Sequence, residues 1–296
     1  MIFEKVTRKK SKARIALVGP SGAGKTLSAL LLAYGITGDW NKIALIDTEH
    51  ERGRFYADRS DFKIGEFLYA AMYAPYSAEK YIDYVNSAAA AVGSDGVVIV
   101  DSFSHAWDNE GGVLDVKDYI EKTNANKNGF SAWNEAGKIQ NNLVNCLLSV
   151  PCHTIVTMRA KMAYAMEVNE RGKTVPVKIG LAPVQRENTE YEFDVVLQIN
   201  REHIASASKD TTFLDSWSGV ITSGLGQQLR DWLDKGEEPI KCADCGKLIT
   251  SNARLSASEI VQKTTERYGK ILCGACAKKE QARIDEANNA AQTVPE

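Results

Sequence analysis

The eight residues from Gly19 to Thr26 constrain the fold of this chain more than any other feature of its sequence. They are Gly19, Pro20, Ser21, Gly22, Ala23, Gly24, Lys25 and Thr26, and they fit the pattern G-x-x-x-x-G-K-[ST]. In such a segment the glycines allow backbone N–H groups to surround a phosphate, and the following helix adds the positive end of its dipole. The pattern therefore predicts a phosphate-binding loop between a strand and a helix.

The residues on both sides of this loop fit the predicted strand and helix. The apolar run 15–18 is typical of a buried strand, and the apolar run 27–34 is typical of a helix that Gly35 can end. A chance match on a glycine turn would require neither element. We therefore expect nucleotide binding, with Lys25 reaching the terminal phosphates and the Thr26 hydroxyl ligating Mg²⁺.

Two acidic residues stand at the ends of the next predicted strands. Glu49 lies just beyond the segment 42–47, and Asp101 ends the segment 96–101. Ligands of open α/β sheets bind at the carboxyl ends of strands, so both side chains should face the nucleotide. Glu49 can orient or deprotonate the attacking water, and Asp101 can hold Mg²⁺ through water. A strand-end aspartate can instead cap a helix, but its position after a phosphate loop favours the magnesium role.

The stretch from Ile46 to His50, with Tyr56 a few residues on, resembles the equivalent part of bacterial RecA. The resemblance implies that Glu49 is the catalytic base and that Tyr56 stacks on adenine. Gly53 stands where RecA has an aspartate near the base. This departure weakens the implied selectivity for adenine, but it leaves the implied hydrolysis of ATP in place.

The chain more closely resembles the compact RecA-like ATPases of bacteriophages, including the single-strand annealing type. Those proteins share a Tyr-Glu-Phe-Asp-Val-Val segment, here Tyr191 to Val196, and the resemblance covers about residues 12–235. It implies an α/β fold, a RecA-like P-loop NTPase core with a mostly parallel central sheet. Related ATPases have a Lys-x-Arg that reaches phosphates on the adjacent subunit, and here Lys209 is present with Thr211 replacing the arginine. Lys209 is either such a finger in a ring or filament of identical subunits, or an ordinary exposed lysine.

Four basic residues are candidates for contact with single-stranded DNA. They are Arg159, Lys161, Lys178 and Arg186. The first two follow a predicted strand at residues 153–158, and the other two lie in or after a predicted hairpin whose turn is residues 169–172. Arg159 can instead contact a nucleotide phosphate or pair with an acid. Glutamates near Arg186 weaken a simple electrostatic attraction to DNA.

The charge of the whole chain limits any DNA contact to a local patch. The formal net charge is -2 over 296 residues, which is unlike a basic coat for nucleic acid. One basic patch precedes the first strand and consists of Arg8, Lys9, Lys10, Lys12 and Arg14. This patch is either a solvated, mobile terminus or an arm that contacts phosphate or the next subunit. His105, shortly after Asp101, is either a nucleotide sensor or a plain loop histidine.

Two C-x-x-C pairs stand near the end of the chain. Cys242 and Cys245 form the first pair, and Cys273 and Cys276 form the second. In a reducing compartment two such pairs indicate a tetrathiolate Zn²⁺ site rather than disulfides. A zinc ion with four protein ligands has no open position for catalysis, so we expect a structural ion that a small module needs in order to fold.

Composition divides the chain into three parts. We predict an ATPase core at residues 1–236, a four-cysteine zinc-binding module at 237–280, and a polar tail at 281–296, in which a helix frays into a disordered end. No apolar run approaches the roughly 20 residues that span a bilayer. The chain also begins without an apolar signal core, so we expect a cytoplasmic location.

Two functional classes fit these features. The leading hypothesis is an ATPase that uses ATP and Mg²⁺, assembles on single-stranded DNA, and promotes annealing or strand pairing beside a single-strand-binding protein. The main rival is a nucleotide-switched adaptor or loader whose zinc module recruits a replication or packaging partner. A helicase is a third possibility, but the chain lacks room for an obvious accessory helicase domain. Stimulation of hydrolysis by DNA separates the first hypothesis from the second.

Overall fold

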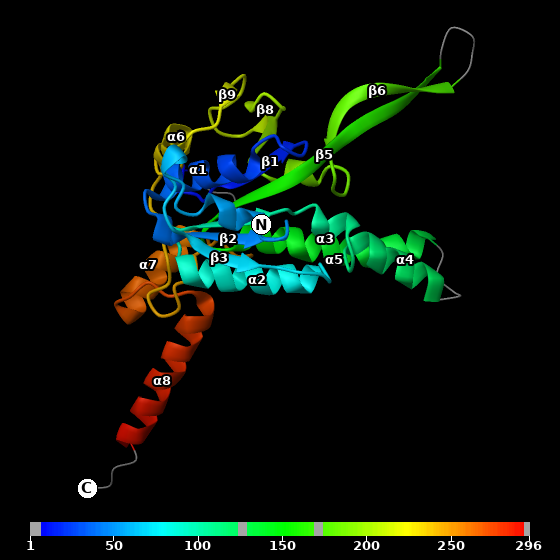
Figure 1. Ribbon diagram of the computed structural model, residues 1–296. Coiled ribbons are helices and arrows are strands. Elements are labelled where there is room, and N and C mark those ends of the chain that lie inside the picture. The colour runs from blue at the N-terminus through cyan, green and yellow to red at the C-terminus, as the bar shows by residue number, and fades with distance from the viewer. Residues whose placement is uncertain (1–6, 124–128, 169–173, 293–296) are drawn as a thin grey trace. The chain divides into compact units, whose positions relative to one another are not determined.

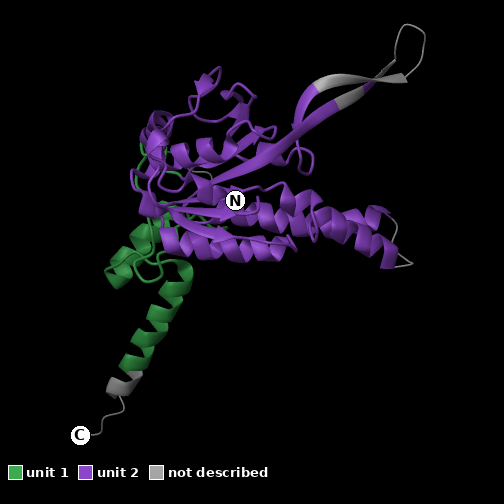
Figure 2. Ribbon diagram, in the orientation of Figure 1, with its two compact units in different colours: residues 1–11, 234–296 green, residues 12–233 purple. Residues whose placement is uncertain are grey.

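The computed structural model describes residues 7–123, 129–168 and 174–292, and it divides into two compact units. The larger unit is residues 12–233, and the smaller unit combines residues 1–11 with 234–296 (Figure 2). Each unit has a hydrophobic cluster of its own.

The larger unit alternates strands and helices along the chain. Its strands are β1 (Arg14–Gly19), β2 (Ile43–Asp47), β3 (Leu68–Ala71), β4 (Val97–Asp101), β5 (His153–Val168), β6 (Thr174–Pro183), β7 (Val195–Ile199), β8 (Ile204–Asp210) and β9 (Ser218–Val220). Its α-helices are α1 (Lys25–Thr37), α2 (Ala78–Val92), α3 (His105–Asp108), α4 (Val113–Thr123), α5 (Gly129–Ser149) and α6 (Ser223–Leu233). Short 3-10 helices are η1 (Trp40–Lys42), η2 (Arg52–Tyr56), η3 (Ser60–Phe62) and η4 (Thr189–Glu192).

The central sheet has the strand order β3-β2-β4-β5-β1-β7-β8-β9. Strands β3, β2, β4, β5, β1 and β7 run parallel, whereas β8 and β9 complete one edge in antiparallel fashion. The carboxyl ends of β1, β2 and β4 therefore meet at one edge of the sheet. The predicted α/β P-loop NTPase core with a mostly parallel sheet is confirmed.

Helices cover both faces of this sheet (Figure 1). One face buries alternate strand residues such as Ile15 and Leu45 against α1 and α6. The other face buries their neighbours, such as Ala16 and Ile46, against α2 and α5. Apolar side chains on both faces explain why the strands read as continuous apolar runs instead of alternating patterns.

Helix α1 continues past Gly35, contrary to the prediction that this glycine ends the helix. The helix ends at Thr37, and Gly38 caps it in the left-handed conformation with a φ of 66°. Gly35 serves instead in packing, because a Cβ atom there would lie 2.0 Å from the carbonyl oxygen of Ser223 in α6. A close approach between two helices, rather than local helix propensity, explains this glycine.

Replacing Gly35 by alanine is therefore expected to destabilise the larger unit by about 1–3 kcal/mol, since the added methyl group overpacks the α1–α6 contact. Urea unfolding measures the change. Gly224→Ala is the matched control, because the Cβ atom added in this exposed turn of α6 would only reach ordinary contact distance, 3.5 Å from Thr222 Oγ1. The control should be neutral or slightly stabilising. Equal losses in both variants would contradict this packing explanation.

Strands β5 and β6 form a long antiparallel hairpin that leaves the central sheet (Figure 1). Arg159 is the residue at which this change occurs. It still pairs with Gly19 of β1, whereas Ala160 already pairs with Pro183 of β6. We call the paired segments 160–168 and 174–183 the β5–β6 arm. The predicted turn at residues 169–172 lies outside the described residues.

The smaller unit contains α7 (Ala257–Tyr268), α8 (Gly274–Gln292) and the chain segment before the larger unit. That segment joins it through backbone hydrogen bonds, from Lys10 N–H to the Glu237 carbonyl and from Glu237 N–H to the Arg8 carbonyl. Grouping residues 7–11 with this unit differs from the predicted core at 1–236.

Helix α8 continues through most of the polar tail, in which we predicted a helix that frays into a disordered end. It is helical to Gln292, and an i,i+4 hydrogen bond of 2.7 Å joins the side chains of Gln281 and Asp285. Pairs at this spacing support a helix even in a polar segment. Residues 293–296 lie outside the described part.

The basic patch before β1 does not form one free arm in the structure. Arg14 is buried in the larger unit, where its guanidinium group donates to the carbonyl oxygens of Leu148, Val150 and Cys152. These carbonyls lie in the last turn of α5 and just after it, where unpaired acceptors need donors. Lys12 pairs with Asp95 at 3.2 Å.

Candidate nucleotide site and cysteine cluster

The predicted phosphate-binding loop lies between β1 and α1, as its pattern requires. Gly22 and Gly24 have left-handed φ values of 81° and 84°, which the glycines of a tight loop adopt readily. The Lys25 ammonium group donates to the carbonyl oxygens of Gly19 at 2.9 Å and Pro20 at 3.0 Å. Burial lowers the pKa of Lys25, while the charges of Asp101 and Glu49 oppose the shift. The loop is thus arranged around a cation, as phosphate binding requires.

The two predicted magnesium ligands lie in contact. Thr26 donates from Oγ1 to Asp101 Oδ2 at 2.5 Å, and Thr157 donates to the other carboxylate oxygen. Burial raises the pKa of Asp101, and these two hydrogen bonds act in the opposite direction. A hydroxyl and a carboxylate at the end of β4 are the hard oxygen donors that Mg²⁺ prefers. The residues present therefore fit this ion.

Glu49 is held by Arg159 across the carboxyl ends of β2 and β5. Arg159 Nε and Nη2 donate to the two carboxylate oxygens at 2.9 Å and 2.8 Å. Burial favours a raised pKa for Glu49, but the hydrogen bonds and charge of Arg159 prevail and lower it. Glu49 is therefore an ionised acceptor near Lys25, as a base for the attacking water must be.

Asp47 is a structural element of the site that sequence reasoning missed. It ends β2 and accepts hydrogen bonds from the backbone N–H groups of Glu49 at 2.6 Å and Gly53 at 2.7 Å. The Tyr69 hydroxyl donates to the same carboxylate at 2.9 Å. These bonds fix the turn that presents Glu49. The signal was available, since Asp47 is a strand-end acid like Asp101.

The geometry around Gly53 accounts for the departure from the RecA pattern. A Cβ atom at Gly53 would lie 2.6 Å from Leu45 Cδ2 and 2.9 Å from Asp47 Oδ2. An aspartate at this position would therefore collide with the Asp47 carboxylate that organises the turn. The residue that stabilises this turn is Asp47.

Tyr56 ends η2 and is partly buried against the α1 side of the core. Burial raises its pKa, and the Asp101 charge adds to the shift. Its stacking on adenine stays a prediction. His203, in the turn between β7 and β8, also reaches the loop through Nδ1, which donates to the Ala23 carbonyl at 3.0 Å. No local pattern in the sequence predicts this contact, because the two residues are far apart in the chain.

Lys209 lies on β8, where its ammonium group donates to the Tyr191 carbonyl. It thus contacts the end of η4 in its own chain, and a finger role toward an adjacent subunit stays a prediction. Thr211, in place of the arginine of related ATPases, donates to the Asp194 carbonyl at 3.2 Å.

The structure separates the four candidate DNA residues. Arg159 pairs with Glu49, and Lys161 is exposed at the base of the β5–β6 arm. The Lys178 side chain lies outside the described ones. Arg186 donates to Asn141 at 3.0 Å and lines a polar pocket of about 390 Å³.

A glutamine connects the segment after β4 to the chain that follows β6. Gln185 donates to the Phe103 carbonyl at 3.2 Å, and its side-chain oxygen accepts from Gln140 and from the Arg186 backbone, each at 2.9 Å. A glutamine from the loop after β6 therefore contacts the segment next to Asp101.

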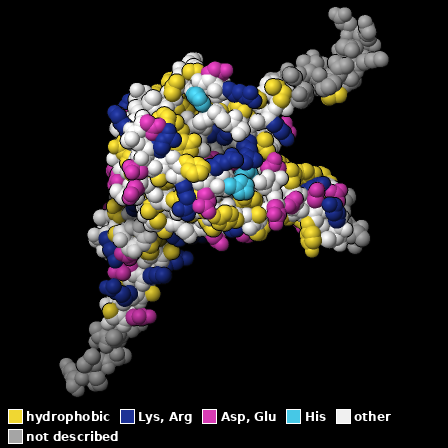
Figure 3. Space-filling view, in the orientation of Figure 1, with side chains coloured by type: hydrophobic (Ala, Val, Ile, Leu, Met, Phe, Trp, Pro, Cys, Tyr) yellow, Lys and Arg dark blue, Asp and Glu magenta, His cyan; other side chains and the backbone are white. Residues whose placement is uncertain are grey.

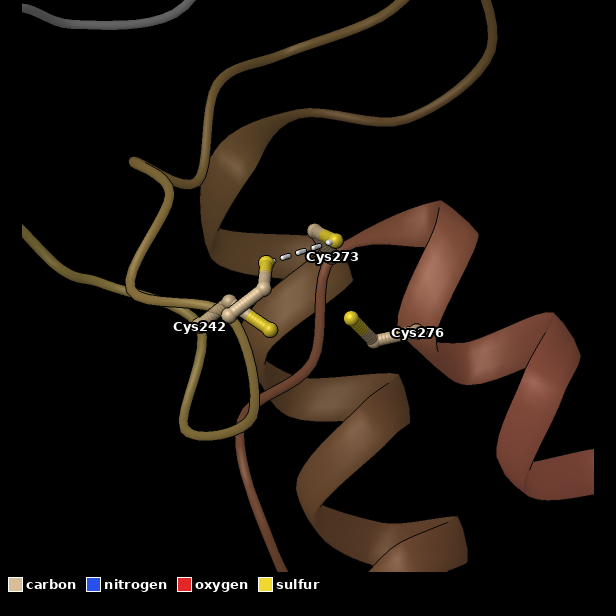
Figure 4. Close-up of side chains that lie close together, drawn as sticks. Cys242, Cys273 and Cys276 are labelled. Atoms are coloured by element: carbon tan, nitrogen blue, oxygen red, sulfur yellow. Dashed lines mark hydrogen bonds between the residues drawn. The ribbon is translucent and has the colours of Figure 1, made fainter.

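The four predicted zinc ligands converge in the smaller unit. Cys242, Cys245, Cys273 and Cys276 place their sulfur atoms within 4.8 Å of one another. Figure 4 shows the thiols of the three labelled cysteines turned toward a common point. The Cys245 and Cys273 sulfurs are 3.7 Å apart, close to the roughly 3.8 Å expected between thiolates around a tetrahedral Zn²⁺. The cluster is therefore compatible with zinc.

Local hydrogen bonds favour a thiolate in this cluster. Desolvation opposes ionisation of Cys242, but backbone N–H groups of Cys273, Cys245 and Asp244 outweigh it and lower its pKa to about 6. The thiolate is the form that binds metal. Cys146 and Cys152 lie in the larger unit and take no part.

The loop, its lysine, the Thr26–Asp101 pair and the strand-end glutamate define the class of a P-loop ATPase domain. The family model described as an AAA domain matches residues 11–222, so the chain belongs to this family. A search of curated proteins finds no match to the chain. Among the described residues, no helix combines the length and apolar character needed to cross a membrane.

Proposed function

We propose that this protein is an ATP- and Mg²⁺-dependent ATPase that acts on single-stranded DNA in recombination, annealing or replication of the bacteriophage type. Glu49 is the base for the attacking water, Lys25 binds the terminal phosphates, and Thr26 with Asp101 holds Mg²⁺. The family supports nucleotide binding and hydrolysis. The action on single-stranded DNA goes beyond what the family indicates and is supported by the structural observation below.

One observation carries the link to DNA: the residue that binds the proposed base directly precedes the β5–β6 arm. Arg159 binds Glu49 through its side chain, and the next residue already pairs with β6. A change at Glu49 can therefore reach the arm through a single strand. The arm exposes the apolar side chains of Met162, Met166 and Leu181 beside Lys161. Exposed apolar groups next to a cation suit contact with unpaired bases and their backbone.

The distribution of surface charge agrees with DNA contact at a small part of the surface and not over a broad basic face. On the face drawn in Figure 3, basic and acidic side chains are interspersed. A modest electrostatic component predicts binding to single strands with a shallow dependence on salt. Assembly of several identical subunits along the strand, with a single-strand-binding protein as partner, completes the proposal.

Single-stranded DNA is expected to raise the ATPase rate of the wild-type protein at least about tenfold, because the arm continues the strand whose Arg159 binds the proposed base. A steady-state ATPase assay with and without a poly-pyrimidine oligonucleotide tests this. The double variant Met162→Ser/Met166→Ser should keep the rate measured without DNA and lose the stimulation. A rate that ignores DNA in the wild-type protein would refute the DNA part and leave the ATPase part standing.

The alternative is a nucleotide-switched adaptor or loader. It is favoured by the existence of the smaller unit with its cysteine cluster, which is separate from the ATPase unit. In this case the ATPase rate would respond to a protein partner bound by the smaller unit. The DNA titration above discriminates between the two candidates.

A further inference from the structure

His105 has a buried ring nitrogen that faces the proposed base without bonding to it. This residue begins α3, and its side chain is 2% exposed. Its Nε2 atom has no hydrogen-bond partner among the described residues, and it lies 3.8 Å from Glu49 Oε1. Buried polar atoms are almost always paired in native proteins. Nε2 therefore requires a partner in some working state of the site.

The contacts of the other ring nitrogen assign the proton of His105. Thr48 Oγ1 already accepts from the Ser102 backbone N–H at 2.8 Å. The Thr48 hydroxyl proton can go to His105 Nδ1 at 2.7 Å or to the Ser102 carbonyl at 3.3 Å. The shorter contact makes Nδ1 the acceptor, and a neutral imidazole with an accepting Nδ1 carries its proton on Nε2. The ring thus presents an N–H donor to Glu49.

The environment keeps this imidazole neutral. Burial lowers the pKa of His105, and the nearby Arg159 charge adds to the shift against the opposing effect of Glu49. A neutral ring can donate from Nε2 without adding charge to the site. His105 therefore acts on Glu49 by holding the carboxylate in place and not by changing the charge of the site.

Arg159, the present partner of Glu49, is also exposed to competition from a bound nucleotide. Its side chain is 42% exposed, whereas that of Glu49 is 18% exposed. Arg159 and Glu49 both lie close enough to Lys25 to shift the pKa of that lysine. A terminal phosphate bound at Lys25 would therefore attract the Arg159 guanidinium, which forms strong paired hydrogen bonds with phosphate.

We propose that His105 is a positioning residue for hydrolysis: it anchors Glu49 through Nε2–H when bound nucleotide draws Arg159 away. The carboxylate then stays oriented toward the attacking water instead of turning to solvent. The movement needed is small, since shortening the 3.8 Å separation by about 1 Å gives an ordinary hydrogen bond. This inference rests on the proposed ATPase function with Glu49 as base.

Two substitutions separate the two nitrogens of His105. The side-chain amide introduced by His105→Gln can place an N–H donor near the former Nε2, whereas His105→Asn places its amide near Nδ1 and leaves Glu49 without the donor. We expect His105→Asn to lower kcat about 10- to 100-fold with KM for ATP unchanged, because a hydrogen bond to a charged group is lost in the reacting state. His105→Gln should recover most of the wild-type kcat. Equal loss in both variants, or loss in neither, would overturn the proposal.

A measurement on the wild-type protein covers the case in which a variant fails to fold. The chain has four histidines, so ¹⁵N-histidine NMR is tractable. Addition of Mg²⁺ with a non-hydrolysable ATP analogue should keep the His105 Nε2 proton in place and move its signal downfield as it bonds to Glu49. An unchanged signal in the nucleotide-bound protein would overturn the proposal.

The design distinguishes failure of this inference from failure of the proposed function. A wild-type protein that binds ATP but does not hydrolyse it would refute the proposed function itself. A wild-type protein that hydrolyses ATP, and loses this activity in Glu49→Gln but not in His105→Asn, would refute only the role of His105.

Discussion

Glu49→Gln is expected to lower kcat for ATP hydrolysis about 10²- to 10⁴-fold while the affinity for ATP stays close to that of the wild-type protein. Glutamine keeps the size of the side chain and one acceptor oxygen, but it cannot take a proton from water. The affinity should persist because the proposed phosphate contacts are with the loop and Lys25, which the substitution leaves unchanged. Steady-state kinetics and binding of a fluorescent ATP analogue measure the two quantities separately.

The substitution also removes the ion pair with Arg159, and this loss has a predictable size. Because Arg159 is 42% exposed, the pair should contribute no more than about 1 kcal/mol to the free energy of unfolding. A large loss of activity therefore cannot be attributed to unfolding if the melting temperature moves by only a few degrees.

Glu51→Gln is the matched control for Glu49→Gln. Glu51 lies two residues further along the same turn, and its carboxylate pairs with Arg54 at 2.7 Å. The control removes one negative charge from the turn without touching the proposed base, so its kcat should stay within about twofold of wild type. If both variants lost activity equally, the general charge of the turn rather than Glu49 would be responsible.

Removing the metal is expected to unfold the smaller unit while the ATPase unit stays folded. The hydrophobic cluster of the smaller unit has few buried members: Cys242, Ile249, Ala257, Ile260 and Leu272. A core of this size cannot offset the entropy of ordering the segment, whereas a structural zinc contributes about 10–16 kcal/mol in small domains. Hydrogen exchange of residues 240–280 with and without a chelator should show loss of protection there and not in β1 or α1.

Two controls make the metal prediction specific. Metal analysis of the purified protein should give about one zinc per chain, and Cys273→Ser should reduce it sharply. Cys146→Ser changes a thiol that lies outside the cluster and should leave the zinc content unchanged. Protein that contains no zinc, or chelation that leaves hydrogen exchange unchanged, would contradict the prediction.

Local signals in the sequence predict the parts of the site that depend on neighbours in the chain. The loop at residues 19–26 is recognisable because its glycines, lysine and threonine act within one turn of backbone. Asp101 is recognisable because the strand before it is continuous and apolar. The sheet that brings Asp101 to Thr26 follows from the alternation of strands and helices.

Pairings between distant residues are the parts that the sequence did not predict. Arg159 and Glu49 are 110 positions apart in the chain, and each could pair with several other residues on the evidence of the sequence alone. The strand order determines the pair, because β2 and β5 lie on either side of β4. Glycine is a common helix terminator, so local sequence predicts a helix end at Gly35, whereas the role of this glycine depends on a carbonyl in α6. The Arg14 guanidinium is another case, since a cluster of basic residues predicts an exposed side chain and not one bonded to carbonyl groups at the end of α5.

Helix α6 packs against α1, so the hydrophobic core of the larger unit extends beyond the residues that match the family model. The family match ends at residue 222, one position before α6 begins. Leu225, Leu229 and Leu233 of that helix are buried in the same cluster as Leu32 and Ile36 of α1. A fragment cut at the family boundary would present this apolar side of α1 to water and would tend to aggregate. The shortest fragment suitable for separate expression therefore extends to Leu233, because the family match ends before the hydrophobic core does.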